Sequence, residues 1–134
     1  MPIKWKNEYS VNVEEIDGQH KEYLKLVNEL YDAINTQKTR ENLSKIIGRL
    51  IEYADFHFST EEKYFREFKY PLAKEHIIEH RKFSEKMDEL SKKHKNKEIE
   101  ISFELVDYLE DWLVDHLAKQ DKKYTKCFND NGLY

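Results

Sequence analysis

Apolar side chains recur every three or four residues along most of this chain, and that period constrains the fold more than any other feature of the sequence. The first run covers residues 18–37 and includes Tyr23, Val27 and Leu30. Such a period is typical of a helix with one apolar face. Later runs predict three further helices, at about residues 39–68, 71–95 and 102–127.

The predicted helices are joined by short polar links. Asp17 and Thr39 are expected to cap the first two, because their side-chain oxygens can accept a hydrogen bond from a backbone N–H of the first turn. Pro71 fits the first turn of the third helix. Residues 1–16 lack a helical period and are predicted to form an extended arm. The pattern therefore predicts an all-α fold, an up-down-up-down four-helix bundle with an N-terminal arm.

The composition supports a helical protein and argues against several classes of function. Three Gly and two Pro leave little material for turns between many strands. Both charge signs are interspersed at a net charge of -4, so we expect no nucleic-acid partner. No apolar run approaches the ~18 residues that cross a bilayer, and the start lacks the apolar region of a secretory signal. With one cysteine, Cys127, we expect a cytoplasmic protein, built as a single domain over residues 1–134.

Residues 76–80 read HIIEH, which matches the HxxEH pattern of an inverted zinc-protease motif. In that interpretation His76 and His80 bind zinc and Glu79 is the general base. Two histidines four residues apart also occur by chance on a solvated helix face. The five letters alone leave both interpretations open, so the rest of the chain has to decide.

Other potential metal ligands lie at matching depths on the four predicted helices. At about 1.5 Å per residue, their distances from the helix links agree within roughly one turn. We therefore expect these side chains to converge inside the bundle: His20, His57, Glu61, His76, His80, His116 and Asp121. His94 lies close to the third link and is predicted to be a surface residue. Glu79 projects about 100° around its helix from His80 and is predicted to be solvated.

Seven converging ligands are too many for one tetrahedral zinc with an open position, so the peptidase interpretation weakens. Two octahedral metals offer twelve positions. Five histidines fill five of them, two bridging carboxylates fill four, and a bridging oxo or hydroxo group fills two. One position remains for a small terminal ligand. The imidazole-rich set suits iron, although it excludes neither copper nor zinc.

The segments that carry these ligands resemble the hemerythrins, most closely the single-domain bacterial kind. The similarity covers nearly the whole chain and includes WKNEYSVNVEEIDGQH, HFSTEE, YPLAKEHIIEHRKF and WLVDHLAKQD. All seven ligand positions are filled in order. Phe65 is a departure, because many relatives carry Met there after the HFxxEE segment. This change concerns the packing beside the ligands and leaves the ligand set intact.

The resemblance implies a non-haem di-iron protein that binds O2 reversibly, as a carrier, store, delivery module or sensor, and that also takes small anions such as azide. It implies that one iron is held by His76, His80 and His116. The other is held by His20 and His57 and keeps the free position. Five neutral imidazoles favour holding O2 over consuming it, so we expect a binding protein rather than an enzyme. The alternative is a di-iron oxidase, or a reductase of peroxide or nitric oxide.

By the same resemblance Glu61 and Asp121 bridge the two irons, together with an oxo or hydroxo group. His116 and Asp121 are five residues apart, which is about 140° around an ideal helix. We therefore predict a local distortion between them, such as a π-bulge. Leu113 and Leu117 lie one turn before and one residue after His116. They are expected to roof the O2 position and to keep it dry.

Overall fold

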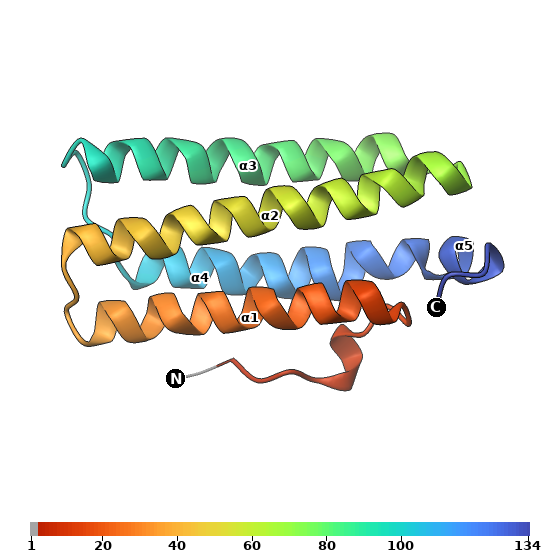
Figure 1. Ribbon diagram of the computed structural model, residues 1–134, viewed down its shortest axis with the longest axis horizontal. Helices are drawn as coiled ribbons and strands as arrows, with labels where there is room; N and C mark the ends of the chain where they lie inside the picture. The colour runs from red at the N-terminus through yellow and green to blue at the C-terminus, as the bar shows by residue number, and fades with distance from the viewer. Residues whose placement is uncertain (1–2) are drawn as a thin grey trace.

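The computed structural model describes residues 3–134, in which four long helical stretches lie side by side (Figure 1). The first three are α1 (Glu14–Asn35), α2 (Arg40–Phe68) and α3 (Ala73–Lys95), and the fourth begins with α4 (Phe103–Trp112). Successive stretches run in opposite directions, so the predicted all-α, up-down-up-down bundle is confirmed. Residues 1 and 2 of the predicted arm lie outside the described residues.

The fourth stretch changes its hydrogen-bond spacing three times, where the sequence predicted one helix to about residue 127. After α4 come the π-helical segment η2 (Leu113–Gln120), the 3-10 turn η3 (Asp121–Tyr124) and α5 (Thr125–Asp130). The backbone stays right-handed helical at the junctions, with φ -57° at Leu113 and -67° at Asp121. The chain is therefore rewound rather than broken in this stretch.

The cap predicted at Thr39 is confirmed, because its side chain accepts a hydrogen bond from the Asn42 N–H at 3.1 Å. The cap predicted at Asp17 is wrong, since α1 already begins at Glu14. The Asp17 carboxylate instead accepts hydrogen bonds from the Ser10 hydroxyl at 2.5 Å and the Val11 N–H at 2.8 Å. It therefore fastens the arm against the first turns of α1.

The start of the third helix also differs from the prediction, which placed Pro71 in its first turn. Lys69 ends α2 in the left-handed conformation, at φ 52° and ψ 49°. The Ala73 N–H then donates to the Tyr70 carbonyl at 3.2 Å and closes a separate turn. Pro71 is the second residue of this turn, where its fixed φ fits, so α3 begins only at Ala73.

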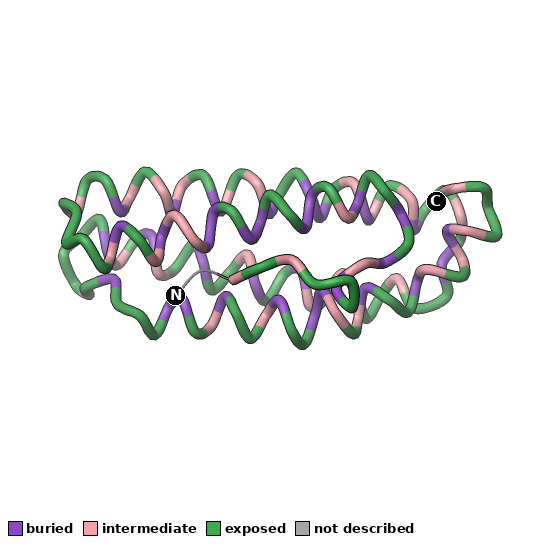
Figure 2. Tube along the Cα trace, turned by 90° about the horizontal axis from the view of Figure 1, so that it is seen from below, coloured by how far each residue is buried: buried purple, intermediate pink, exposed green. Residues whose placement is uncertain are grey.

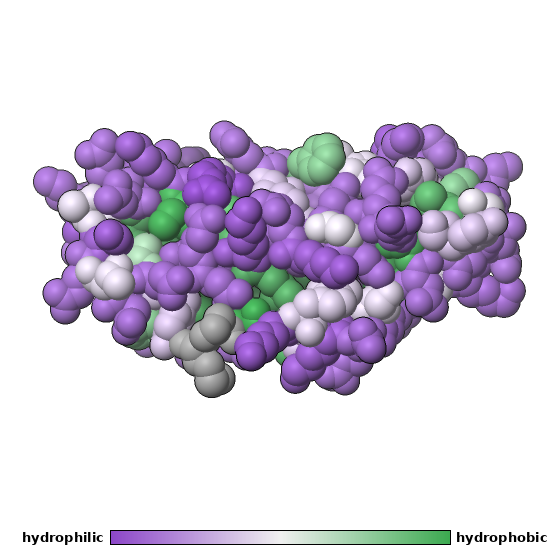
Figure 3. All heavy atoms as spheres, turned by 60° about the horizontal axis from the view of Figure 1, so that its bottom comes forward, coloured by the Kyte–Doolittle hydropathy of each residue, from purple (hydrophilic) through white to green (hydrophobic). Residues whose placement is uncertain are grey.

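The apolar faces of the helices pack into two buried clusters. The larger one runs along the bundle and includes Val27, Leu30, Ile47, Met87 and Leu109. The smaller one joins the arm to the end of the chain and consists of Val11, Val13, Ile16, Phe65, Tyr70, Tyr124 and Phe128. Buried residues recur along each helix, and the surface view is dominated by hydrophilic residues (Figures 2 and 3). Among residues 3–134, no helix has the length and apolar character that crossing a membrane requires.

The prediction that His94 lies on the surface is wrong, because its side chain is only 1% exposed. Its Nδ1 lies 2.9 Å from the Ser44 hydroxyl. Arg40 donates hydrogen bonds to the carbonyls of His94 and Ile99, at 3.0 and 3.3 Å. These contacts tie the first turns of α2 to the end of α3 and to the α3–α4 link, where the imidazole is buried.

Candidate metal centre

Seven buried polar side chains from all four helical stretches converge inside the bundle. They are the residues predicted from the sequence: His20, His57, Glu61, His76, His80, His116 and Asp121. None of them is more than 6% exposed. Glu79 stays outside the cluster and keeps 47% of its side chain exposed, as predicted for a solvated charge. The HIIEH segment thus contributes its two histidines to the cluster without its glutamate.

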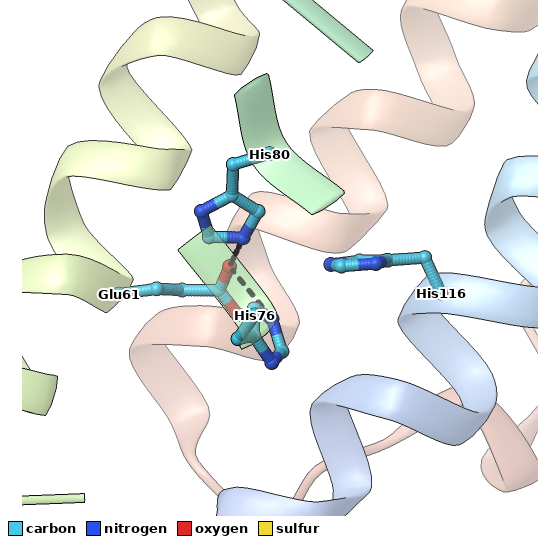
Figure 4. Close-up of side chains that lie close together, drawn as sticks. All are labelled: Glu61, His76, His80 and His116. Carbon is cyan, nitrogen blue, oxygen red and sulfur yellow. Dashed lines mark ion pairs between the residues drawn. The ribbon is translucent and has the colours of Figure 1, made fainter. Parts of the chain in front are cut away.

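One group of ligand atoms belongs to Glu61, His76, His80 and His116, whose nitrogens and oxygen lie within 4.8 Å of one another. Glu61 Oε1 is 3.0 Å from His80 Nε2 and 3.9 Å from His76 Nε2. The four side chains point toward one another from three different helical stretches (Figure 4). They form a pocket of three imidazoles and one carboxylate that is large enough for a metal ion.

A second group of ligand atoms belongs to His20, His57, Glu61 and Asp121, again within 4.8 Å of one another. Glu61 Oε1 is 3.3 Å from His57 Nε2, and Asp121 Oδ2 is 3.1 Å from His20 Nε2. Glu61 is therefore a member of both groups. The two groups thus have one ligand in common, as two neighbouring metal positions would.

Asp121 also faces both groups through its two oxygens. Its Oδ1 lies 2.7 Å from His76 Nε2 and 3.1 Å from His116 Nε2, while Oδ2 faces His20. The distortion predicted between His116 and Asp121 is confirmed, since η2 is π-helical and the Asp121 N–H bonds to the His116 carbonyl. Bonding between residues five apart brings both side chains to one face of the helix, which a regular α-helix would not do.

The donor atoms at the centre are buried and lack hydrogen-bond partners. They are Glu61 Oε1, both carboxylate oxygens of Asp121, and the Nε2 atoms of His20, His57, His76, His80 and His116. A buried polar atom without a partner costs about 1–3 kcal/mol. Imidazole nitrogens and carboxylate oxygens aimed at one volume are the ligands that iron and similar metals take in proteins. The residues present therefore fit a pair of metal ions.

The electrostatics of the cluster put His57 and Glu61 in the forms that bind metal. Burial lowers the pKa of His57 to about 4, so this imidazole is neutral. Burial and Asp121 raise the pKa of Glu61, but His57 and His80 outweigh them and bring it down to about 2. Burial lowers the pKa of His80, whereas the adjacent carboxylates of Glu61 and Glu62 raise it to about 9. Metal binding would therefore release a proton from His80.

Aromatic rings fix the planes of three of these imidazoles. Trp112 stacks on His116 with the ring centroids 4.1 Å apart and the planes 9° apart. Phe58 stacks on His80 at 4.0 Å and 12°. Phe65, the departure from the pattern of many hemerythrins, is buried with its ring edge-on to His76 at 5.0 Å. A rigid aromatic wall thus lies beside the ligands at the position of the departure.

Three further polar residues contact the ligands and were missed in the sequence. The Tyr124 hydroxyl donates to Glu61 Oε2 at 2.5 Å. Gln19 and Glu62 contact the outer ring nitrogens of His57 and His80. Gln19 and Glu62 adjoin a predicted ligand in sequence, and Tyr124 lies one turn after Asp121. That adjacency was the available signal.

Leu113 and Leu117 flank His116 on η2 and are completely or almost completely buried, at 0 and 1% exposure. Both belong to the larger hydrophobic cluster, together with Leu24 and Phe58. Leu113 and Leu117 therefore form a buried apolar wall beside His116.

Comparison with known proteins identifies the family. The family model of the hemerythrin HHE cation binding domain matches residues 11–127. This chain belongs to the hemerythrin family. The bacteriohemerythrin of Methylococcus capsulatus is 34% identical over 122 residues, which cover 91% of this chain and 92% of that protein. The bacteriohemerythrin of Aquifex aeolicus is 34% identical over 119 residues, with 86% and 88% covered.

The three-dimensional comparison agrees. The crystal structure of a wild-type hemerythrin superposes with a TM-score of 0.90 at 33% sequence identity, covering 95% of this chain and 98% of that one. A hemerythrin with a leucine-to-alanine substitution superposes with a TM-score of 0.89 at 32% identity, with 93% and 95% covered. Family membership and the converging donor atoms together identify the cluster as a di-iron centre.

Proposed function

We propose that this chain binds O2 reversibly at a non-haem di-iron centre. The observation that carries the proposal is the convergence of five imidazoles and two carboxylates in two groups that share Glu61. One iron would be held by His76, His80 and His116. The other would be held by His20 and His57. Glu61 and Asp121 would bridge them, which their contacts with histidines of both groups support.

The ligand composition favours binding of O2 over its consumption. The iron pair, when bound, supplies the two electrons that O2 takes up on binding. Di-iron enzymes of the ferritin-like class use carboxylate-rich sites built on Glu-x-x-His motifs. Here Glu61 and Asp121 are the two carboxylates among seven ligands. A site with fewer anionic ligands stabilises high-valent iron less. This site is therefore suited to holding O2 and releasing it.

The protein's own contribution is to hold the ligands and to exclude water. The hydrogen bond from Tyr124 occupies Glu61 Oε2, while Glu61 Oε1 faces the histidines. Leu113 and Leu117 form a buried apolar wall beside His116. We assign this wall to the O2 position, where a dry surface slows protonation and loss of the bound ligand. Small anions such as azide would compete for the same position.

Purified protein loaded with iron tests the function directly. We expect about two irons per chain, as the octahedral count requires. On exposure of the reduced protein to air, we expect a coloured adduct whose absorption band disappears when O2 is removed. Rapid bleaching with turnover of added reductant would instead identify an oxidase or reductase.

The proposed setting is the cytoplasm. A single free cysteine, Cys127, is compatible with a reducing compartment. Fractionation of the native cells followed by detection of the protein in the soluble cytoplasmic fraction would test this proposal. Recovery from the periplasm or the medium would refute it.

A further inference from the structure

Two histidines of the centre have a hydrogen-bond partner behind the ring, and the two partners differ in charge. His80 Nδ1 lies 2.9 Å from a carboxylate oxygen of Glu62. His57 Nδ1 lies 2.6 Å from the side-chain oxygen of Gln19. The two rings belong to different ligand groups. One group is therefore backed by an anion and the other by a neutral amide.

The orientation of the Gln19 amide follows from its other contact. Its Nε2 lies 3.2 Å from the Thr60 hydroxyl oxygen, and that hydroxyl donates its proton to the Phe56 carbonyl at 3.1 Å. A hydroxyl has one proton, so Thr60 must accept a hydrogen bond from the Gln19 nitrogen. The Gln19 oxygen then faces His57. His57 accordingly carries a proton on Nδ1 and directs Nε2 at the centre.

The Glu62 contact fixes His80 in the same way, but with a charge. A carboxylate can only accept, so His80 Nδ1 donates and His80 Nε2 faces Glu61 Oε1 at 3.0 Å. Glu62 keeps 27% of its side chain exposed and lines a groove of about 310 Å³ between α2 and α3. The same groove is lined by Glu85, which is exposed and lies one turn and a half after His80 on α3.

An anionic acceptor behind a histidine raises the basicity of the ligand nitrogen more than a neutral acceptor does, because the shared proton is drawn outward. A more basic ligand favours the higher oxidation state of its metal. We propose that Glu62 and Gln19 are positioning residues that make the two iron positions unequal. Glu62 favours ferric iron at the position held by His76, His80 and His116. Gln19, being neutral, leaves His57 the less basic metal ligand. His57 belongs to the position assigned to O2.

The proposal rests on the proposed di-iron function and adds an order of oxidation to it. When the pair holds one ferric and one ferrous ion, the ferric ion belongs at the three-histidine position. The ferrous ion then remains at the position where O2 would bind. The three-to-two difference in histidines favours the same order, so variants that leave every ligand in place are needed to isolate the effect of Glu62 and Gln19.

The chain allows a reciprocal test with a matched control. E62Q replaces the anion with an amide, and Q19E replaces the amide with an anion. E85Q removes an equal charge from the same groove without removing the hydrogen bond to His80. All three variants and the wild type are loaded with ⁵⁷Fe, titrated electrochemically and challenged with a ferric chelator. Mössbauer spectra of half-reduced samples report how ferric iron is distributed between the two positions.

We expect E62Q to weaken ferric relative to ferrous binding about tenfold, a rise of about 59 mV in the one-electron midpoint potential. Ferric iron should leave E62Q about 10–100-fold faster. Q19E should lower the one-electron midpoint potential of the iron held by His20 and His57. In the double variant of E62Q and Q19E, ferric iron in half-reduced samples should move to that position. E85Q should shift the potential far less than E62Q, because its charge is screened by solvent.

The proposal is overturned if E62Q behaves like E85Q, or if Q19E shifts the potential in the same direction as E62Q. If E62Q retains no iron, the comparison of Q19E with the wild type decides. A protein that shows these shifts but forms no reversible O2 adduct would refute the O2 function alone. A protein that forms the adduct without the shifts would refute only the roles of Glu62 and Gln19.

Discussion

Histidine is buried in two places in this bundle, the metal centre and the link end, where α3 meets the α3–α4 link. At the link end, His94 Nδ1 contacts the Ser44 hydroxyl, and Arg40 donates to the carbonyls of His94 and Ile99. At the centre, five imidazoles from all four helical stretches face two carboxylates. Burial is alike in the two places, at 1% for His94 and 1% for His20.

The difference teaches which observation identifies a ligand. His94 Nε2 is also buried and lacks a hydrogen-bond partner, like the Nε2 atoms at the centre. A single unpaired nitrogen therefore does not distinguish a metal ligand from a packed side chain. The distinguishing feature is that several such atoms from separate helices meet in one volume. The link end offers one imidazole, and the centre offers five together with two carboxylates.

The largest effect is expected from His116→Ala. This change removes a ligand from the group of Glu61, His76 and His80 and leaves the other donors around an incomplete site. We expect a loss of at least one iron per chain and of the O2 adduct, measured by metal analysis and absorption spectroscopy. Full iron content with normal O2 binding would show that His116 is no ligand and would remove the contrast with His94.

His94→Ala should have the opposite pattern, losing stability and keeping iron. The substitution leaves a cavity and deprives the half-buried Ser44 hydroxyl of its partner. We expect the free energy of unfolding to fall by about 1–3 kcal/mol, measured by urea unfolding of the metal-free protein. His94→Gln, which can keep a hydrogen bond to Ser44, is the control and should lose less. An iron deficit in His94→Ala would contradict the assignment of His94 to packing alone.

Leu113→Asn tests the apolar wall of the centre, where no ligand is changed. A polar side chain at this buried position would admit water beside His116. We expect iron content to stay at the wild-type level and autoxidation to the diferric form to speed up about tenfold, which is about 1.4 kcal/mol of barrier. The measurement is the decay of the oxygenated absorption band in air at fixed pH. A wild-type rate with full iron would make Leu113 ordinary core.

The contrast between the two places also explains what the sequence could predict. The helical period of the apolar residues predicts which face of each helix is buried. The ligands lie at similar distances from the helix links, which brings them to one level of the bundle. The fold and the convergence of seven side chains therefore follow from local spacing. The five-residue spacing of His116 and Asp121 even predicted the π-helical segment. The burial of His94 accompanies contacts with Ser44 and Arg40 on another helix, and the role of Asp17 depends on the arm that folds back to it. Such contacts join residues far apart in sequence, and no period encodes them.

The smallest effect concerns pH and isolates the link end. Burial and the nearby Arg40 guanidinium lower the pKa of His94, and Glu100 opposes them without reversing the shift. A lowered folded-state pKa means that the neutral imidazole stabilises the fold above the ordinary histidine pKa of about 6.5. Below that pH the unfolded chain takes up a proton that the folded chain refuses, so stability falls.

The measurement is a comparison of differences in the metal-free protein. Urea midpoints at pH 7 and pH 5 are recorded for the wild type and for His94→Ala. All other ionisable groups are common to the two proteins, so their contribution cancels in the comparison. We expect the wild type to lose more stability than the variant on going from pH 7 to pH 5. Equal losses would mean that His94 takes up its proton as readily in the folded as in the unfolded chain, and that burial and Arg40 do not lower its pKa.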